Sequence, residues 1–524
     1  MCGIWGYIVH NGTIKNDYYE YFKKISHRGP NNSIYTKIKN VYIGFHRLAI
    51  QETALDGNQP FEYKNSLITC NGEIYNYKDL INKYKLNISN NSDCLTILEL
   101  YKSLSFEDFL NVLKNELIAE FSFIIYDFDE NNILTKIIAS RDVVGVRPLF
   151  YGNDIDNNII FSSEIKGIPN DINIMEFPCG HLYINDLLNN TITLTDFRYI
   201  YDIKEKEENL NNIKNTLIDA VKNRLICDNN IEIAYLLSGG LDSSLICSIA
   251  SKLSKNKIKT FSIGFEGSTD LPYAKKVADF IGSDHTEIII TEKEALDVID
   301  DVIYCLETYD ITTIRASVPN YLLAKYIRNN TNISVCLSGE GSDELLSGYI
   351  FNYNAPNDIE LHNCSINYVK NIHLYDGRRC DRCLSYFGLE ARVPFLDLNF
   401  IKAVWETPAL LRMPTINRIE KFILREAFND NTYLPNECLF RKKEAFSDGI
   451  SSKNKSWFKI IESNIKCIKR DDSPTIESSY YKNKFIEFFG ENRLNIIPNY
   501  WQPAFQNNNI YIDPSARILN VYND

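Results

Sequence analysis

The chain has 524 residues, 44% of them apolar and 24% charged, a globular composition that excludes disorder of the whole chain. Its formal net charge is −12, which disfavours nucleic acid and anionic membranes as main partners, because proteins that bind these without sequence specificity are basic. No apolar run could span a membrane, no secretory signal opens the sequence, and the thirteen cysteines are scattered, so we expect a cytoplasmic enzyme with reduced thiols.

The first 200 residues have the pattern of a β-rich domain. Aromatic and β-branched runs separated by Asn, Asp and Gly predict strands at 4–9, 41–50, 66–70, 121–128, 132–140 and 158–164. Leucines spaced for one helical face predict helix within 93–115. Because such elements must bury one face, we expect an α+β fold of stacked antiparallel sheets with helices outside.

The pattern changes after the polar, charged segment 202–212, which is typical of a linker. Beyond it, expected strands at 231–237, 259–265, 286–291 and 332–338 alternate with expected helices at 243–253, 273–282 and 295–307. This alternation predicts an α/β domain with a parallel sheet and helices on both faces. We place the two domains at 2–203 and 204–524, and expect the last 120 residues to form a helical bundle on the second.

The strongest local motif, Ser238-Gly-Gly-Leu-Asp-Ser-Ser244, follows a buried strand and opens a helix. Adjacent glycines allow a tight turn whose N–H groups face an anion, and the helix N-terminus adds further donors. The motif lacks the spacing and the lysine of a Walker A loop. Asp242 would repel a phosphate unless a cation lay between them, which predicts Mg²⁺. Taken alone, the motif could also be a Gly/Ser turn that caps a helix.

A second acidic loop, Ser338-Gly-Glu-Gly-Ser-Asp-Glu344, follows the last expected strand. Open α/β sheets bind ligands at the carboxyl ends of their strands, so the two loops predict one site. Together they resemble the ATP-pyrophosphatase family, whose members adenylate a substrate and release pyrophosphate. The resemblance implies Mg²⁺ ligands at Asp242 and Asp343. It also implies ATP contacts at Leu236, Ser238, Gly239, Gly240, Asp242, Ser243, Ser244, Ile263, Ser338 and Gly339.

Three further stretches narrow the resemblance. The sequences at 312–317 (TTIRAS), 388–397 (GLEARVPFLD) and 441–448 (RKKEAFSD) are similar to those of the glutamine-hydrolysing asparagine synthetases. The resemblance implies that Arg315 and Lys443 neutralise phosphate charge as pyrophosphate leaves. It also implies that Glu340 assists the attack of ammonia on β-aspartyl-AMP.

At the other end of the chain, Cys2 directly follows the initiator methionine. If Met1 is removed, the thiol and the new α-amine belong to one residue. The amine has a reference pKa of roughly 7.7–8.0 and can act as the base for the thiol. No separate histidine is then needed, which fits a sequence without a Cys/His pair at a catalytic spacing.

Nearby motifs contain the partners that such a nucleophile needs. Arg47 can bind a carboxylate with two hydrogen bonds, and Asp93 can pair with an ammonium group. Asn71 and Gly72 can form an oxyanion hole. These features describe hydrolysis of the glutamine side-chain amide and resemble the class II glutamine amidotransferases. That resemblance implies a glutamine pocket lined by Arg47, Leu48, Ala49, Ile50, Gln51, Asn71, Gly72, Glu73 and Asp93.

The family resemblance extends from Cys2 to the sequence DPSAR at 513–517. It implies that ATP, L-aspartate, L-glutamine and water are converted to L-asparagine, L-glutamate, AMP and diphosphate. Ammonia would pass from Cys2 to the adenylate through an internal channel. Homodimerisation is a further expectation from the family.

Four alternatives bear on the function. A related ATP-dependent amidotransferase would use a different carboxylate acceptor, and would fail with free aspartate while still hydrolysing glutamine. A lactam-forming cyclase would normally lack the nucleophile, so Cys2 and Arg47 argue against it. A non-catalytic relative should have lost Asp242, Asp343 or Cys2. An RNA-modifying enzyme is disfavoured by the acidic net charge and by the lack of a basic, aromatic patch.

Overall fold

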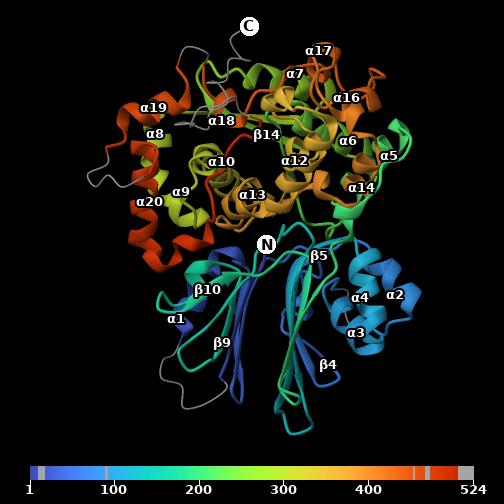
Figure 1. Ribbon diagram of the computed structural model, residues 1–524, viewed down its shortest axis with the longest axis vertical. Coiled ribbons are helices and arrows are strands. Elements are labelled where there is room, and N and C mark those ends of the chain that lie inside the picture. Colours follow the sequence, from blue (N-terminus) through green and yellow to red (C-terminus); the bar gives the residue numbers. More distant parts are fainter. Residues whose placement is uncertain (10–17, 89–91, 453–454, 467–472, 506–524) are drawn as a thin grey trace.

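The computed structural model describes residues 1–9, 18–88, 92–452, 455–466 and 473–505. Two antiparallel sheets form the lower part of the molecule in Figure 1, and a helix-covered parallel sheet forms the upper part. The N-terminus lies where the two parts meet (Figure 1). The motif at 513–517 lies outside the described residues. No helix in the described part of the chain is long and apolar enough to cross a membrane.

The first antiparallel sheet has the order β10-β8-β9-β1-β3-β2 in the described part of the chain. Its strands are β1 (Gly3–Ile8), β2 (Asn32–Ile38), β3 (Val41–Arg47), β8 (Phe150–Asn153), β9 (Ile159–Ser162) and β10 (Asn173–Glu176). β1 pairs with β3 and β9, with Gly3 opposite His46 and Trp5 opposite Ser162. Every residue of β1 is buried, so the strand that follows Cys2 is packed on both faces.

The second antiparallel sheet has the order β12-β11-β7-β6-β5-β4. Its strands are β4 (Phe61–Tyr63), β5 (Ser66–Ile74), β6 (Ala119–Phe128), β7 (Leu134–Arg141), β11 (His181–Asp186) and β12 (Thr191–Asp196). The inner faces of the two sheets share one core, in which Ile4, Ile43 and Phe161 pack with Ile124 and Ile137. The stacked antiparallel sheets and all six expected strands are therefore confirmed. β2 and β12 lie outside the expected runs because they are largely solvent-accessible and polar.

Four helices accompany these sheets in the described residues, and α2, α3 and α4 lie outside the second sheet (Figure 1). Their bounds are α1 (Tyr19–Lys23), α2 (Tyr77–Tyr84), α3 (Leu95–Ser103) and α4 (Phe106–Asn115). The helical region expected at 93–115 is divided in two. Ser105 adopts an extended conformation, and its hydroxyl accepts the backbone N–H of Asp108 at 3.1 Å, which caps α4.

The third sheet has the order β15-β14-β13-β16-β17, and all its neighbouring strands are parallel. Its strands are β13 (Ile233–Leu236), β14 (Lys259–Phe265), β15 (Asp284–Ile290), β16 (Val335–Leu337) and β17 (Glu390–Arg392). The four expected strands and the α/β class are confirmed. β17 is not predicted from the sequence, because three residues are too few to show the hydrophobic pattern of a strand.

Helices surround this sheet, and the expected helix at 295–307 is interrupted at Val298. Their bounds are α5 (Leu210–Asn223), α6 (Leu241–Leu253), α7 (Leu271–Ile281), α8 (Glu292–Asp297), α9 (Ile299–Leu306), α10 (Ile311–Asn330), α11 (Ser342–Leu345), α12 (Asp358–Asn371), α13 (Asp376–Ser385), α14 (Leu398–Glu406), α15 (Ala409–Arg412), α16 (Phe422–Ala427), α17 (Asn436–Leu439), α18 (Phe446–Gly449), α19 (Trp457–Asn464) and α20 (Ile476–Phe489). The expected C-terminal bundle is instead a series of mostly short helices. Pro408, Pro414 and Pro435 interrupt the chain between them.

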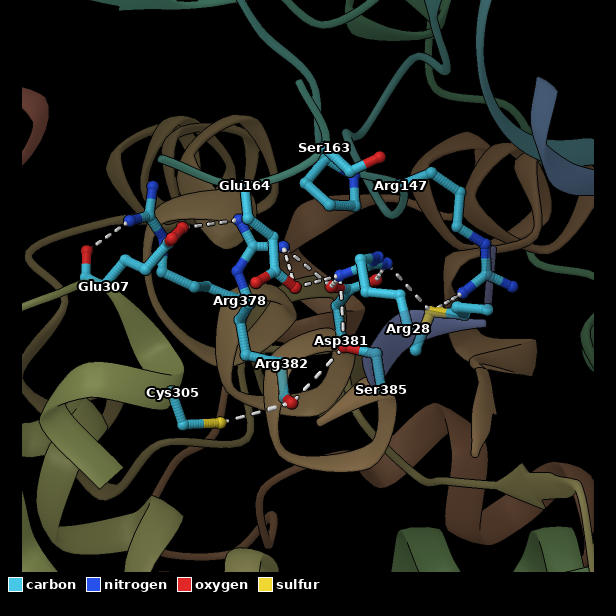
Figure 2. Close-up of polar contacts among 12 residues, drawn as sticks. Arg28, Arg147, Ser163, Glu164, Cys305, Glu307, Arg378, Asp381, Arg382 and Ser385 are labelled. Carbon is cyan, nitrogen blue, oxygen red and sulfur yellow. Dashed lines mark hydrogen bonds and ion pairs between the residues drawn. The ribbon is translucent and has the colours of Figure 1, made fainter. Parts of the chain in front are cut away.

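The two parts of the molecule meet across a buried cluster of charged side chains (Figure 2). Arg28 of the amino-terminal part donates to Glu164 at 2.7 Å and to Asp381 of α13 at 2.8 Å. Arg382, the next residue of α13, lies 3.3 Å from Glu307. Removal of one member of a buried ion pair leaves an uncompensated charge, so single substitutions in this cluster should destabilise the folded protein.

A second interface contact allows a test of this stabilisation. Glu120 of β6 binds two buried arginines, Arg147 at 3.0 Å and Arg224, which directly follows α5, at 2.8 Å. Glu120→Ala removes the carboxylate that both guanidinium groups share, so we expect the free energy of unfolding to fall by about 3–5 kcal/mol. Denaturant titration followed by fluorescence measures the change. Glu130→Ala at an exposed turn is the control, and an equal effect of both substitutions would contradict the stabilising role.

Candidate active sites

Cys2 immediately precedes β1 and is anchored through its backbone. Its carbonyl oxygen accepts a hydrogen bond from Nε of Arg28 at 2.9 Å, and its thiol lies 3.8 Å from the carbonyl oxygen of Leu48. Burial raises the pKa of the thiol to about 11, which keeps the thiol neutral at neutral pH. Met1 is fully buried, and burial lowers the pKa of its α-amine to about 6. While Met1 is attached, the nitrogen of Cys2 belongs to a peptide bond and cannot act as a base.

Arg47, at the end of β3, lies near Cys2. Its Nη1 donates to the carbonyl oxygen of Ala54 at 2.7 Å and to Oδ1 of Asn58 at 3.0 Å, which orients the guanidinium. Burial lowers the pKa of Arg47, and a thiolate at Cys2 would raise it, so the two side chains are within electrostatic reach. Residues 48–51 follow directly, with Leu48 in contact with the thiol of Cys2.

Asn71 and Gly72 occupy consecutive positions in β5. The Asn71 side chain is fully buried, yet neither its amide oxygen nor its amide nitrogen has a hydrogen-bond partner among the described residues. Buried amides are normally paired, so this one is available to a ligand. A Cβ at Gly72 would approach the carbonyl oxygen of Glu120 to 2.5 Å, so a side chain does not fit there. This arrangement is compatible with an oxyanion hole.

Two buried carboxylates, Glu73 and Asp93, lie within electrostatic reach of each other. The side-chain amide of Gln51 donates to Glu73, and Asp93 accepts the backbone N–H of Ile74 at 2.7 Å. Burial raises the pKa of Asp93 to about 6 and the pKa of Glu73 well above its usual range. A cationic group placed between them would favour their ionised forms, which is what a substrate ammonium group would supply.

In the carboxyl-terminal part, the loops that follow β13 and β16 line one cavity. It is lined by Leu236, Ser238, Gly240, Asp242, Ser243, Ile263, Arg315, Ser338, Gly339, Glu340, Asp343 and Lys443. Gly239 and Ser244 belong to the first loop but do not line the cavity. Gly239 has a φ of +80°, and a Cβ there would lie 2.4 Å from the backbone nitrogen of Ala274, so this turn requires glycine.

Two carboxylates converge on one cationic atom in this cavity. Nζ of Lys421 lies 2.5 Å from Asp242 and 2.6 Å from Asp343, and Lys443 also pairs with Asp343. Despite burial, the two ammonium groups hold the pKa of Asp343 well below its usual range. A cation already bridges the carboxylates, so the pair fits Mg²⁺, which takes one or two carboxylates together with phosphate oxygens. In the described part of the chain, no cluster of three or more His, Cys, Asp or Glu forms a metal site.

Glu340, in the loop after β16, and Arg315, on α10, are each paired with a side chain from a distant helix. Nη2 of Arg379, on α13, lies 2.7 Å from Oε2 of Glu340. Burial raises the pKa of Glu340 to about 7, although Arg379 opposes the shift, so this carboxylate can exchange a proton near neutral pH. Nε of Arg315 donates to Glu477 of α20 at 2.9 Å.

Comparisons with known proteins identify the family. A model described as a glutamine amidotransferase domain matches residues 1–208, and one described as asparagine synthase matches residues 212–359 and 353–509. The chain belongs to the asparagine synthase family. It is 39% identical to a protein of Acanthamoeba polyphaga mimivirus named probable asparagine synthetase (glutamine-hydrolyzing), over 99% of this chain and 100% of the relative. Relatives from Mesocricetus auratus and Homo sapiens, named asparagine synthetase (glutamine-hydrolyzing), are 37% and 36% identical over 100% of this chain and 99% of theirs.

In this member of the asparagine synthase family, several residues that line the cavity are not indicated by any motif in the sequence. Lys421, Asp376, Arg379 and Tyr349 all line the cavity, and Tyr349 donates to Glu344 at 2.6 Å. They come from separate segments, and a single Lys, Arg or Tyr in a helical or irregular stretch is indistinguishable from a surface residue. The Glu-Lys dipeptide at 420–421 offers no motif that could have identified Lys421.

Proposed function

We propose that the protein is a glutamine-hydrolysing asparagine synthetase. It would convert ATP, L-aspartate, L-glutamine and water to L-asparagine, L-glutamate, AMP and diphosphate. The observation that carries this proposal is the pairing, in one chain, of two sites. One comprises Cys2, Arg47 within electrostatic reach of its thiol, and the buried Asn71 amide, which has no hydrogen-bond partner among the described residues. The other is the cavity where Asp242 and Asp343 share a cation. Full-length similarity to relatives with this name supports it.

We assign glutamine hydrolysis to a first domain, residues 2–203. Removal of Met1 frees the α-amine of Cys2, which takes the thiol proton as sulfur attacks the side-chain carbonyl carbon of glutamine. The Asn71 amide and the Gly72 N–H donate to the oxyanion. The amine returns the proton to the departing nitrogen, so ammonia leaves and a γ-glutamyl thioester remains. Water hydrolyses the thioester, which releases glutamate and restores the thiol.

Substrate recognition in this domain follows from charge. Arg47 would bind the α-carboxylate of glutamine, because its guanidinium is already oriented by Ala54 and Asn58. Glu73 and Asp93 would hold the α-ammonium group, which offsets the cost of burying two carboxylates. The segment from Leu48 to Gln51, which includes Ala49 and Ile50, would form the adjoining wall of the pocket.

We assign asparagine formation to a second domain, residues 204–524. An oxygen of the aspartate β-carboxylate attacks the α-phosphorus of ATP, which gives β-aspartyl-AMP and pyrophosphate. Mg²⁺ held by Asp242 and Asp343 would neutralise phosphate charge. Arg315 and Lys443 would stabilise charge that develops on the leaving pyrophosphate. Ammonia then displaces AMP, and Glu340, with a pKa of about 7, accepts the proton from the attacking nitrogen.

The remaining contacts of this site concern the nucleotide. The loop from Ser238 to Ser244, which includes Gly239, Gly240 and Ser243, would cradle pyrophosphate through its N–H groups and hydroxyls. The nucleotide would also be contacted by Leu236, Ile263, Ser338 and Gly339.

From family membership we further propose a cytoplasmic homodimer, for which an equilibrium mass near twice 60.6 kDa is expected in analytical ultracentrifugation.

The decisive assay supplies ATP, Mg²⁺ and aspartate with either glutamine or ammonium, and measures asparagine and AMP. We expect asparagine with both nitrogen sources, at one AMP per asparagine. Glutamate release without asparagine would contradict the proposal and would instead favour an amidotransferase that uses a different carboxylate acceptor. Absence of glutamate release would contradict the assignment of the first domain.

A further inference from the structure

Arg392, from the carboxyl-terminal half of the chain, reaches the glutamine pocket of the other half. It ends β17, an edge strand of the parallel sheet, and its side chain is fully buried. Nη2 lies 3.3 Å from Oε2 of Glu73, one of the two pocket carboxylates. Because Nη2 has no hydrogen-bond partner in the described part of the chain, its contact with Glu73 is an ion pair.

The other nitrogens of this guanidinium fix its orientation. Nε lies 2.8 Å from Oε1 of Glu390, and Nη1 donates to the carbonyl oxygens of Arg224 at 2.9 Å and Ile226 at 2.6 Å. A guanidinium is planar and its donors have a fixed geometry, so these three contacts determine where Nη2 lies. The result is a buried positive charge held between Glu390 and Glu73.

The backbone of Arg392 contacts the other site. Arg392 pairs with Leu337 of β16, and the N–H of Ser338 donates to the carbonyl oxygen of Arg392 at 3.0 Å. Ser338 begins the acidic loop that lines the ATP cavity. One residue therefore places its side chain at the glutamine pocket and its carbonyl at the start of the ATP loop.

We propose that Arg392 is a positioning residue for glutamine, holding Glu73 where this carboxylate binds the α-ammonium group of the substrate. The inference rests on the function proposed above. It means that the glutamine pocket is complete only when the parallel sheet of the synthetase half has formed. Glutamine affinity, and not the chemistry of Cys2, is the property that Arg392 controls.

The charge of Glu73 depends on groups from several elements around it. Burial raises the pKa of Glu73, Glu390 and Asp93 raise it further, and Arg392 and the amide of Gln51 lower it. Glu73 must be ionised to bind an ammonium group, so a higher pKa restricts binding to higher pH. Loss of the charge at 392 should move the acid limb of kcat/KM for glutamine to higher pH. Loss of the charge at 390 should move it to lower pH.

The test compares full-length Arg392→Gln, Arg392→Lys and Glu390→Gln with the parent enzyme. KM for L-glutamine is measured by glutamate release. Glutaramate, which has the same amide and carboxylate but no ammonium group, is measured as a competitive inhibitor. For Arg392→Gln we expect the glutamine KM to rise roughly 10- to 100-fold, as for loss of a charge-assisted contact, with glutaramate affinity and ammonium-dependent synthesis unchanged. Arg392→Lys keeps the charge and should show a smaller rise.

Arg378→Gln is the matched control, because Arg378 is also a buried interface arginine but pairs with Glu176, at 3.0 Å, outside the glutamine pocket. Any effect of Arg378→Gln on glutamine affinity should be matched by an equal effect on glutaramate affinity. An unchanged glutamine KM in Arg392→Gln, or an equal loss of glutaramate affinity, would overturn the inference and leave the proposed function standing. No glutamate release by the parent enzyme would overturn both.

If Arg392→Gln does not fold, Glu390→Gln still tests the inference. Glutamine is nearly isosteric with glutamate, so we expect the Glu390→Gln protein to fold. The acid limb of kcat/KM should then move to lower pH with glutamine, while the pH dependence of glutaramate inhibition stays the same. A limb that stays in place would overturn the inference. The rate of glutaramate hydrolysis over the same pH range separates Glu73 from the α-amine of Cys2, because that amine must be deprotonated to cleave either amide, whereas only glutamine presents an ammonium group to Glu73.

Discussion

Replacement of Cys2 by alanine should abolish the use of glutamine while asparagine formation from ammonium continues. The thiol is the only atom of this residue that can form the γ-glutamyl thioester, so we expect glutamate release to fall by at least about 1,000-fold. Alanine still provides the carbonyl oxygen that binds Arg28, so the local backbone should be preserved. Ammonium-dependent synthesis uses the other cavity and should be unaffected. Glutamate and asparagine are quantified separately with each nitrogen source.

Cys364→Ala is the control for this experiment. Cys364 is a half-buried thiol on α12 and belongs to neither candidate site. It should leave both activities unchanged. Asparagine formation from glutamine by the Cys2→Ala protein would refute the N-terminal nucleophile. Intact mass spectrometry of the parent protein completes the test, because the mechanism requires that Met1 be absent from the active enzyme.

The positions of Cys2 and Glu340 give a physical reason for coupling two reactions in one chain. Arg28 binds the carbonyl of Cys2 and pairs with Asp381 of α13, and two residues earlier on the same helix Arg379 pairs with Glu340. One helix thus separates the predicted nucleophile from the predicted base. A route along this buried interface would keep ammonia out of bulk water, where protonation removes its nucleophilic lone pair.

The sequence predicts those parts of the sites whose residues lie together in the chain. The loop at 238–244 combines two glycines, hydroxyls and a carboxylate directly after a buried strand, so its position and its chemistry are both local. Cys2 is informative because of its place at the start of the chain. Asn71 and Gly72 are likewise adjacent in one strand.

The remaining features depend on contacts between distant segments. Arg392 meets Glu73 across more than 300 positions, and Lys421 meets Asp242 across 179. Each is a single charge in an irregular or very short element, so neither periodicity nor spacing distinguishes it from a solvated residue. The ion pair of Arg28 and Asp381 joins residues 353 positions apart, so no local pattern indicates it. Burial and pairing are properties of the folded chain, and they decide which charges belong to the sites.

Asp242→Asn should stop asparagine and pyrophosphate formation with either nitrogen source while glutamine hydrolysis continues. The substitution is nearly isosteric, and the amide oxygen can still accept from Ser342, whose hydroxyl lies 2.7 Å from Oδ1 of Asp242. What is lost is one of the two carboxylates that share a cation here and that we propose as Mg²⁺ ligands, so the metal that would neutralise phosphate charge is held less tightly. We expect pyrophosphate release to fall by about 100- to 1,000-fold, the scale of removing one electrostatic contact at a transition state.

Asp279→Asn, at an exposed position of α7, is the control and should leave pyrophosphate release unchanged. Unimpaired pyrophosphate release by Asp242→Asn would contradict the predicted role of this carboxylate. A parallel loss of glutamine hydrolysis would show instead that the substitution acts through the fold, since the Cys2 pocket lies in the other half of the chain. If Asp242→Asn loses only asparagine formation and Cys2→Ala loses only glutamine hydrolysis, the two reactions take place at two separable sites.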